Sequence, residues 1–122
     1  MIQGTVVGLQ ARMEIFLRPS GASLFGVECV IDTGFEGFLT LPQIIVTNLN
    51  LPFLAPIRAN LADNSRISTN VHLATIVWNG TDREVPVLAM GRRPLIGTAL
   101  LQDYHLGIDF YEGGTVLVDN IL

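Results

Sequence analysis

The sequence contains no lysine, and its only cysteine is Cys29. A single cysteine excludes an internal disulfide and any cluster of cysteine metal ligands. Its place inside an apolar segment predicts a small buried side chain. The formal net charge is −4, and basic residues do not alternate with aromatic ones, so we expect no nucleic-acid partner. The only basic doublet, Arg92-Arg93, favours a solvated turn over a phosphate clamp.

Long hydrophobic runs are also missing. The longest apolar runs, such as residues 73–78, are far too short to cross a bilayer, and no secretory signal is recognisable at the start. We therefore expect a cytoplasmic protein that has no membrane partner. Even so, 49% of the residues are hydrophobic, which is high for a chain of 122 residues. This leaves apolar surface to be covered and favours an oligomer.

Several catalytic and ligand-binding motifs are absent as well. No Gly-x-Ser-x-Gly element is present, and neither Ser65 nor Ser68 has a recognisable base nearby, which argues against a serine hydrolase. There is no glycine-rich phosphate loop. His72 and His105 lack the spacing of metal ligands, and we expect them to be structural. The sequence therefore predicts neither a metal site nor a cofactor.

Turn residues recur at short intervals between apolar runs, which predicts a single all-β domain over residues 1–122. The strands expected from this pattern cover residues 6–17, 24–31, 57–62, 67–73, 71–78, 83–89, 108–111 and 115–118. A first short helix is expected over residues 42–49, with Pro42 in its first turn. A second is expected from a capping Thr98 to Tyr104, with Gly107 as a stop.

One acidic residue stands in an unusual place, because Asp32-Thr33-Gly34 follows directly on the apolar segment 27–31. A carboxylate at the end of such a strand is partly desolvated, so its charge is costly unless the surroundings need it. Thr33 adds a hydroxyl, and Gly34 lets another backbone approach closely. In a structural interpretation, Asp32 caps a turn with the next two residues. In a catalytic interpretation, it is presented at the floor of a cleft.

Four stretches of the chain stand in an informative order. They are Val30-Ile31-Asp32-Thr33-Gly34-Phe35-Glu36-Gly37 running into Leu39-Thr40-Leu41-Pro42, then Leu61-Ala62-Asp63-Asn64-Ser65, then Val77-Trp78-Asn79-Gly80, and finally Leu95-Ile96-Gly97 followed by Leu100-Leu101 and Leu106-Gly107-Ile108-Asp109. Asp-Thr-Gly alone is a weak signal, but the ordered set spans most of the chain. In this order the sequence resembles the retroviral-type (retropepsin-like) aspartic proteases, and most of all their small single-domain prokaryotic members.

The resemblance implies a closed retropepsin-like barrel with one or two short helices, in which Asp32 is the catalytic carboxylate. It implies that the Thr33 hydroxyl braces two active-site loops and that Gly34 offers its carbonyl to the substrate. The other residues that it places at the substrate or in a covering flap are Phe35, Ala62, Asp63, Asn64, Ser65, Leu95 and Ile96, of which the last two would pack beneath the catalytic loop. Asn64 stands where glycine is frequent, and Asn tolerates the left-handed backbone of a tight turn.

This chemistry needs two carboxylates that share one proton, and the chain has one Asp-Thr-Gly. The resemblance therefore implies a symmetric homodimer in which Asp32 meets its copy across a twofold axis. The two ends of the chain, residues 1–7 and 115–122, are candidate dimer strands. An equally open alternative makes them ordinary strands of the chain's own sheet.

Two functions follow from these expectations. The first is an aspartic endopeptidase, a homodimer that cleaves a peptide or protein substrate held extended under the flaps. The second is a non-proteolytic dimeric module on the same fold that binds peptides or other proteins. The intact Asp32-Thr33-Gly34 favours the first, because a module without catalysis has no need of the acid.

Overall fold

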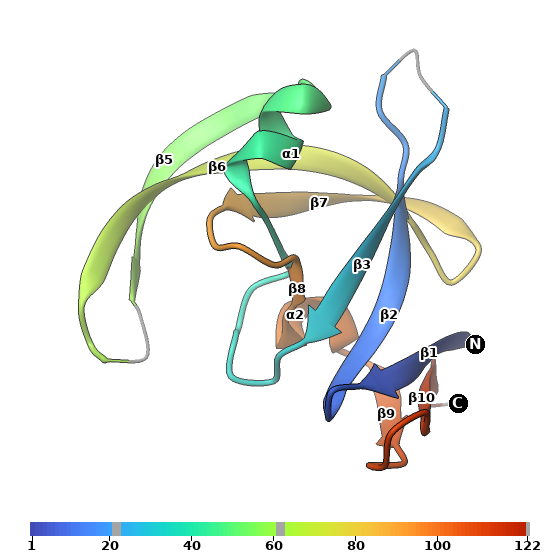
Figure 1. Ribbon diagram of the computed structural model, residues 1–122. Helices are drawn as coiled ribbons and strands as arrows, with labels where there is room; N and C mark the ends of the chain where they lie inside the picture. The colour runs from blue at the N-terminus through green and yellow to red at the C-terminus, as the bar shows by residue number, and fades with distance from the viewer. Residues whose placement is uncertain (21–22, 61–62, 122) are drawn as a thin grey trace.

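The computed structural model describes residues 1–20, 23–60 and 63–121, and these residues form ten strands and two short helices (Figure 1). The elements are, in chain order, β1 (Ile2–Val7), β2 (Gln10–Leu17), β3 (Phe25–Ile31), β4 (Leu39–Leu41), α1 (Gln43–Asn48), β5 (Phe53–Asn60), β6 (Arg66–Trp78), β7 (Thr81–Ala89), β8 (Leu95–Ile96), α2 (Thr98–Leu101), β9 (Tyr104–Ile108) and β10 (Thr115–Asn120). The prediction of a mostly β protein with one or two short helices is confirmed. No helix among these residues is long and apolar enough to span a membrane.

The strands join into one sheet with the order β5-β6-β7-β4-β8-β3-β2-β1-β10-β9. A further pairing links β6 to β2, where Phe16 stands opposite Val77 and Leu17 opposite Ile76. The first residues of β6, up to Thr69, pair with β5 alone, because the pairing with β7 begins at Asn70. The outer part of the β5–β6 hairpin is therefore a two-stranded arm, which curves away from the rest of the sheet in Figure 1.

Alternation along the strands builds the core. In β2, for example, every second side chain is buried, because successive residues of a strand point to opposite faces. The larger hydrophobic cluster joins residues from β2, β3, β4, β6, β7 and both helices. A smaller cluster consists of Val6, Ala11 and Val116, with Ile31 packed against it. Ile31 directly precedes Asp32, so this smaller cluster supports the end of the strand that carries the acid.

The prediction of one strand over residues 6–17 is wrong. Gly8 and Leu9 form a turn with φ angles of 59° and 57°, and this turn separates β1 from β2 as a hairpin. Leucine rarely adopts a positive φ, so its apolar character concealed the turn from a sequence pattern. The candidate strand over residues 1–7 is present as β1.

The second helix is shorter than predicted. It covers Thr98–Leu101, Gly97 is its N-cap, and no side chain caps it, so the expected capping by Thr98 is wrong. The strand expected over residues 108–111 instead covers Tyr104–Ile108, with Gly107 inside it rather than at a helix end. Pairing with β10 decides this, because the backbone groups of residues 104–108 find their partners there.

Other local predictions are confirmed. Helix α1 lies within the expected range, but Pro42 is its N-cap and not a residue of its first turn. The hairpin at Asn79-Gly80 is present, and both residues have the positive φ angles, 52° and 79°, that a two-residue hairpin turn requires. The segments expected at residues 67–73 and 71–78 are a single strand, β6.

The two ends of the chain pair with each other. Strand β1 runs antiparallel to β10, with Ile2 opposite Val118 and Thr5 opposite Thr115. Strand β10 pairs on its other side with β9. Within one copy, the ends are ordinary strands of the chain's own sheet, and their role as dimer strands stays a prediction. Both hydrogen-bonding edges of β10 are thus occupied within one copy of the chain.

Candidate active site

Asp32 lies at the end of β3, where the chain leaves the sheet. Its backbone N–H donates to the carbonyl of Ile96 at 2.9 Å, and its carboxylate Oδ1 accepts the N–H of Gly34 at 2.9 Å. The side chain is half-buried. The structure thus shows the turn expected from the structural interpretation of Asp32. That turn also fixes one carboxylate oxygen, but Asp32 is not among the residues that line the groove described below, so its catalytic interpretation stays a prediction.

Strand β8 lies beside Asp32, between β3 and β4. It runs parallel to β3, with Ile31 opposite Ile96, and antiparallel to β4. Three backbone hydrogen bonds of 2.8 to 3.1 Å join the loop of residues 32–38 to the segment that follows β8. The N–H groups of Gly97, Thr98 and Ala99 donate to the carbonyls of Phe38, Phe35 and Gly37, in that order. The loop that carries the acid is therefore held by backbone bonds over most of its length.

Phe35 packs its ring between two glycines. A Cβ built on Gly37 would lie 2.5 Å from the ring atom Cζ, and one built on Gly97 would lie 2.6 Å from Cδ2. Real Cβ atoms do not approach a neighbour so closely, so the ring fits here because both neighbours lack a side chain. Phe35 also lines the groove described next, and so links the packing of the loop to the surface that a ligand would contact.

A groove of about 720 Å³ lies between this loop and the two-stranded arm. Residues 34–38 line one wall. The opposite wall comes from β5, β6 and β7, and its residues are Ile57, Arg58, Asn60, Val71, Pro86 and Leu88. None of these six is among the site residues predicted from the sequence. The signal that could have found some of them is the period of two in strands, which puts Pro86 and Leu88 on one face.

The tip of the arm carries the predicted flap residues. Asn64 has a φ of 66°, so the left-handed turn expected at this residue is confirmed. The Asp63 carboxylate accepts hydrogen bonds from the Ser65 hydroxyl and from the Ser65 N–H, and these bonds lower the pKa of Asp63. They favour the ionised form, so the turn loses their support as the pH falls through that lowered pKa. Ala62 lies outside the described residues.

Of the other predicted site residues, two pack beneath the loop and one is exposed. Ile96 is fully buried beneath the loop, and Leu95 is half-buried with its N–H bonded to Thr40 Oγ1 at 3.1 Å. Neither lines the groove, so packing beneath the loop is the place that the structure gives them. The exposed Thr33 makes no side-chain hydrogen bond to the described residues. Within the same ranges, no three His, Cys, Asp or Glu side chains are grouped as metal ligands.

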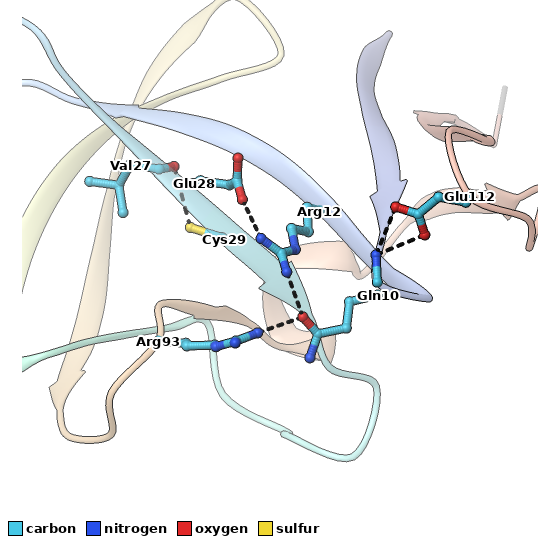
Figure 2. Close-up of polar contacts among 8 residues, drawn as sticks. Gln10, Arg12, Val27, Glu28, Cys29, Arg93 and Glu112 are labelled. Carbon is cyan, nitrogen blue, oxygen red and sulfur yellow. Dashed lines mark hydrogen bonds and ion pairs between the residues drawn. The ribbon is translucent and has the colours of Figure 1, made fainter.

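A polar network joins the start of β2 to the turn before β8 (Figure 2). Gln10 Oε1 accepts from Arg12 Nη2 at 3.1 Å and from Arg93 Nη1 at 2.6 Å. Arg12 also forms an ion pair of 2.9 Å with Glu28. Arg12 stands opposite Val30, two residues before Asp32, where the pairing of β2 with β3 ends. Arg93 is exposed, as expected for a solvated turn, and its contact ties this turn to the region of the acid.

Cys29 is buried in β3, and its thiol lies 3.6 Å from the carbonyl of Val27 (Figure 2). Burial, and to a lesser extent the charge of Glu28, raises the pKa of the thiol to about 12.

Because the thiolate is the reactive form, the thiol of Cys29 in the folded protein is expected to react at least about 100 times more slowly with a disulfide reagent at pH 8 than the same thiol in the unfolded chain. Absorbance assays with and without denaturant measure both rates. Equal rates would show that Cys29 is accessible.

Comparisons with known proteins do not identify the chain. A scan against models of protein families finds no match, and a search of curated proteins finds no relative. The resemblance to retropepsin-like proteases therefore rests on the sequence motifs alone.

Proposed function

We propose that this protein is an aspartic endopeptidase of the retropepsin-like type and that it acts as a homodimer. The observation that carries the proposal is the placement of Asp32. Its carboxylate is held by Gly34 in a loop that is fastened to residues 96–99, and the same loop forms one wall of the groove. The link between β6 and β2 supports a closed barrel of the kind that this family has.

In the proposed mechanism, the Asp32 carboxylates of two copies meet across a twofold axis and share one proton. Two carboxyl groups that are close enough to share a proton do not both ionise readily, because their negative charges repel each other. This favours the half-protonated pair. The ionised carboxylate takes a proton from water as the water oxygen bonds to the carbonyl carbon of the scissile peptide, and the protonated carboxyl donates to the carbonyl oxygen, which gives a diol. The carboxyl that gained the proton then donates it to the peptide nitrogen, and the other carboxylate takes a proton from the diol. The C–N bond breaks, the amine leaves, and the pair again holds one proton. The arm of β5 and β6 would cover the bound peptide and exclude water.

The lining of the groove indicates which side chains the peptide would carry. Most of the wall residues are apolar, including Phe38, Ile57 and Leu88, while Glu36 and Arg58 add one charge of each sign. An apolar side chain bound here would remove apolar surface from water on both partners. We therefore expect cleavage beside a large apolar residue in an extended peptide.

A second candidate is a dimeric module that binds peptides without cutting them. The bond from the Gly34 N–H to Asp32 favours it, because this bond gives the acid a structural role that does not depend on catalysis. Cleavage separates the two candidates, since binding alone leaves the peptide intact.

The test is a peptide-library cleavage assay of the full chain from acidic to neutral pH, combined with sedimentation over a range of protein concentrations. The protease proposal expects cut peptides with apolar residues at the cut, under conditions in which the dimer is populated. Binding of library peptides without any cut product would support the module instead. A monomer at the highest concentration would remove the second carboxylate, and with it the mechanism.

A further inference from the structure

Four large apolar side chains are exposed at and beside two turns of the chain. Val7, Leu9, Phe110 and Tyr111, which we call the tip surface, are 40%, 66%, 63% and 63% exposed. Val7 is the last residue of β1, Leu9 lies in the turn between β1 and β2, and the other two lie in the turn between β9 and β10. Exposed apolar side chains are common singly, but a group on adjoining turns is typical of an interaction site.

The two turns are fastened together. Gly8 N donates to both carboxylate oxygens of Glu112, at 3.0 and 2.9 Å (Figure 2). Val6 N donates to the Gly114 carbonyl, and Gly113 N donates to the Val6 carbonyl, both at 2.9 Å. The tip surface therefore has a backbone held by bonds between distant parts of the chain. A surface of this kind loses little conformational freedom when a partner binds.

Leu9 is the least expected member of the tip surface. It is the most exposed of the four, and its φ is 57°, in the left-handed region that leucine rarely adopts. Asn or Gly would fit the turn with less strain and would leave no apolar side chain in water. A strained, exposed apolar residue indicates a role outside the folding of the single chain.

The tip surface adjoins the acid. Ile31, which directly precedes Asp32, packs against the cluster of Val6, Ala11 and Val116, and Val6 and Ala11 stand on either side of the turn that contains Leu9. A twofold axis that brings two Asp32 carboxylates together must also bring the surfaces around them together. The chain's own ends do not offer a dimer sheet through β10, because that strand is paired on both sides.

We propose that the tip surface is where a second copy of this chain docks, with Leu9 as its central contact. This inference rests on the proposed function, because that function requires the second Asp32. It replaces the terminal strands by the β1–β2 and β9–β10 turns as the contact between copies.

The test compares Leu9→Asn with Ile44→Asn by sedimentation equilibrium of the full chain. Asn suits the positive φ of Leu9, so the variant is expected to fold as well as the wild type while losing the apolar contact. Ile44 is 68% exposed on α1 and serves as the matched control. We expect Leu9→Asn to raise the dissociation constant of the dimer at least about 30-fold and Ile44→Asn to change it less than about twofold.

A cross-linking measurement gives a second readout that does not depend on affinity. The buried Cys29 leaves a cysteine introduced at Leu9 or at Ile44 as the accessible thiol. A short bis-maleimide is expected to join two copies through Leu9→Cys and not through Ile44→Cys. An unchanged dissociation constant in Leu9→Asn, or cross-linking through Ile44→Cys alone, would overturn the tip surface as the interface.

Cleavage is scored separately, so that the two proposals fail in different ways. If Leu9→Asn weakens a dimer that cuts no peptide, the tip surface stands and the protease proposal falls. If the wild type cuts peptides and Leu9→Asn dimerises and cuts equally well, the protease proposal stands and the tip surface falls.

Discussion

Asp32→Asn is expected to lower kcat/KM for peptide cleavage by at least about 10³-fold, because general acid–base catalysis by a positioned carboxyl contributes roughly that much or more. In a homodimer the change removes both carboxylates at once. An asparagine oxygen still accepts the N–H of Gly34, so the turn is retained. We therefore expect the free energy of unfolding to change by less than about 0.5 kcal/mol. Peptide-cleavage kinetics and denaturant unfolding measure the two quantities.

Two further variants make the result specific. Asp32→Ala also removes the acceptor, so it is expected to cost about 1 kcal/mol of stability in addition to activity. Asp103→Asn is the matched control, because Asp103 is exposed and has a φ of 72°, which Asn tolerates. It should leave cleavage unchanged. Wild-type cleavage by Asp32→Asn would exclude the proposed mechanism and leave Asp32 with its structural role alone.

Gly97→Ala is expected to lower the free energy of unfolding by about 3 kcal/mol, at the upper end of what overpacking costs. The added Cβ would lie 2.1 Å from the carbonyl oxygen of Gly37 and 2.7 Å from that of Phe35. Both are backbone atoms, so no side chain can move aside to relieve the clash. The loop that carries Asp32 must shift instead, and cleavage is expected to fall with stability. Thermal unfolding should show a melting temperature lower by on the order of 10 °C.

Gly107→Ala is the matched control for this prediction. A Cβ at Gly107 would have as its nearest neighbour Nε2 of His105 at 3.8 Å, an ordinary contact, and its φ is not positive. Its effect on stability is expected to stay within about 0.5 kcal/mol. Equal melting temperatures for the two glycine variants would show that the loop is free to move away from Gly97.

Local signals in the sequence were sufficient for several parts of the fold. Asn79-Gly80 predicted its hairpin, because both residues adopt positive φ without strain. Asn64 predicted a left-handed turn for the same reason. Pro42 and the apolar residues after it predicted α1. Each of these features depends on the backbone preferences of a few neighbouring residues.

The errors have a common cause. Leu9 sits in a turn that its residue type disfavours, and Tyr104–Ile108 is a strand where a helix and a stop were expected. In both places, pairing with the neighbouring strand, β1 with β2 and β9 with β10, overrides the local preference, since buried backbone groups need partners. The groove was missed in part for a related reason: its second wall is assembled from β5, β6 and β7, and sequence spacing does not show which of their faces meet the loop.

By itself, the sequence determined that this chain is mostly β and that an apolar strand ends in Asp32-Thr33-Gly34. Only the tertiary structure decided that Ile96 bonds the backbone of Asp32 and that the terminal strands pair with each other. The physical reason is the range of the interactions. Alternation and turn chemistry act between neighbours, whereas strand pairing joins backbone groups that lie more than sixty residues apart and is settled by the whole sheet together.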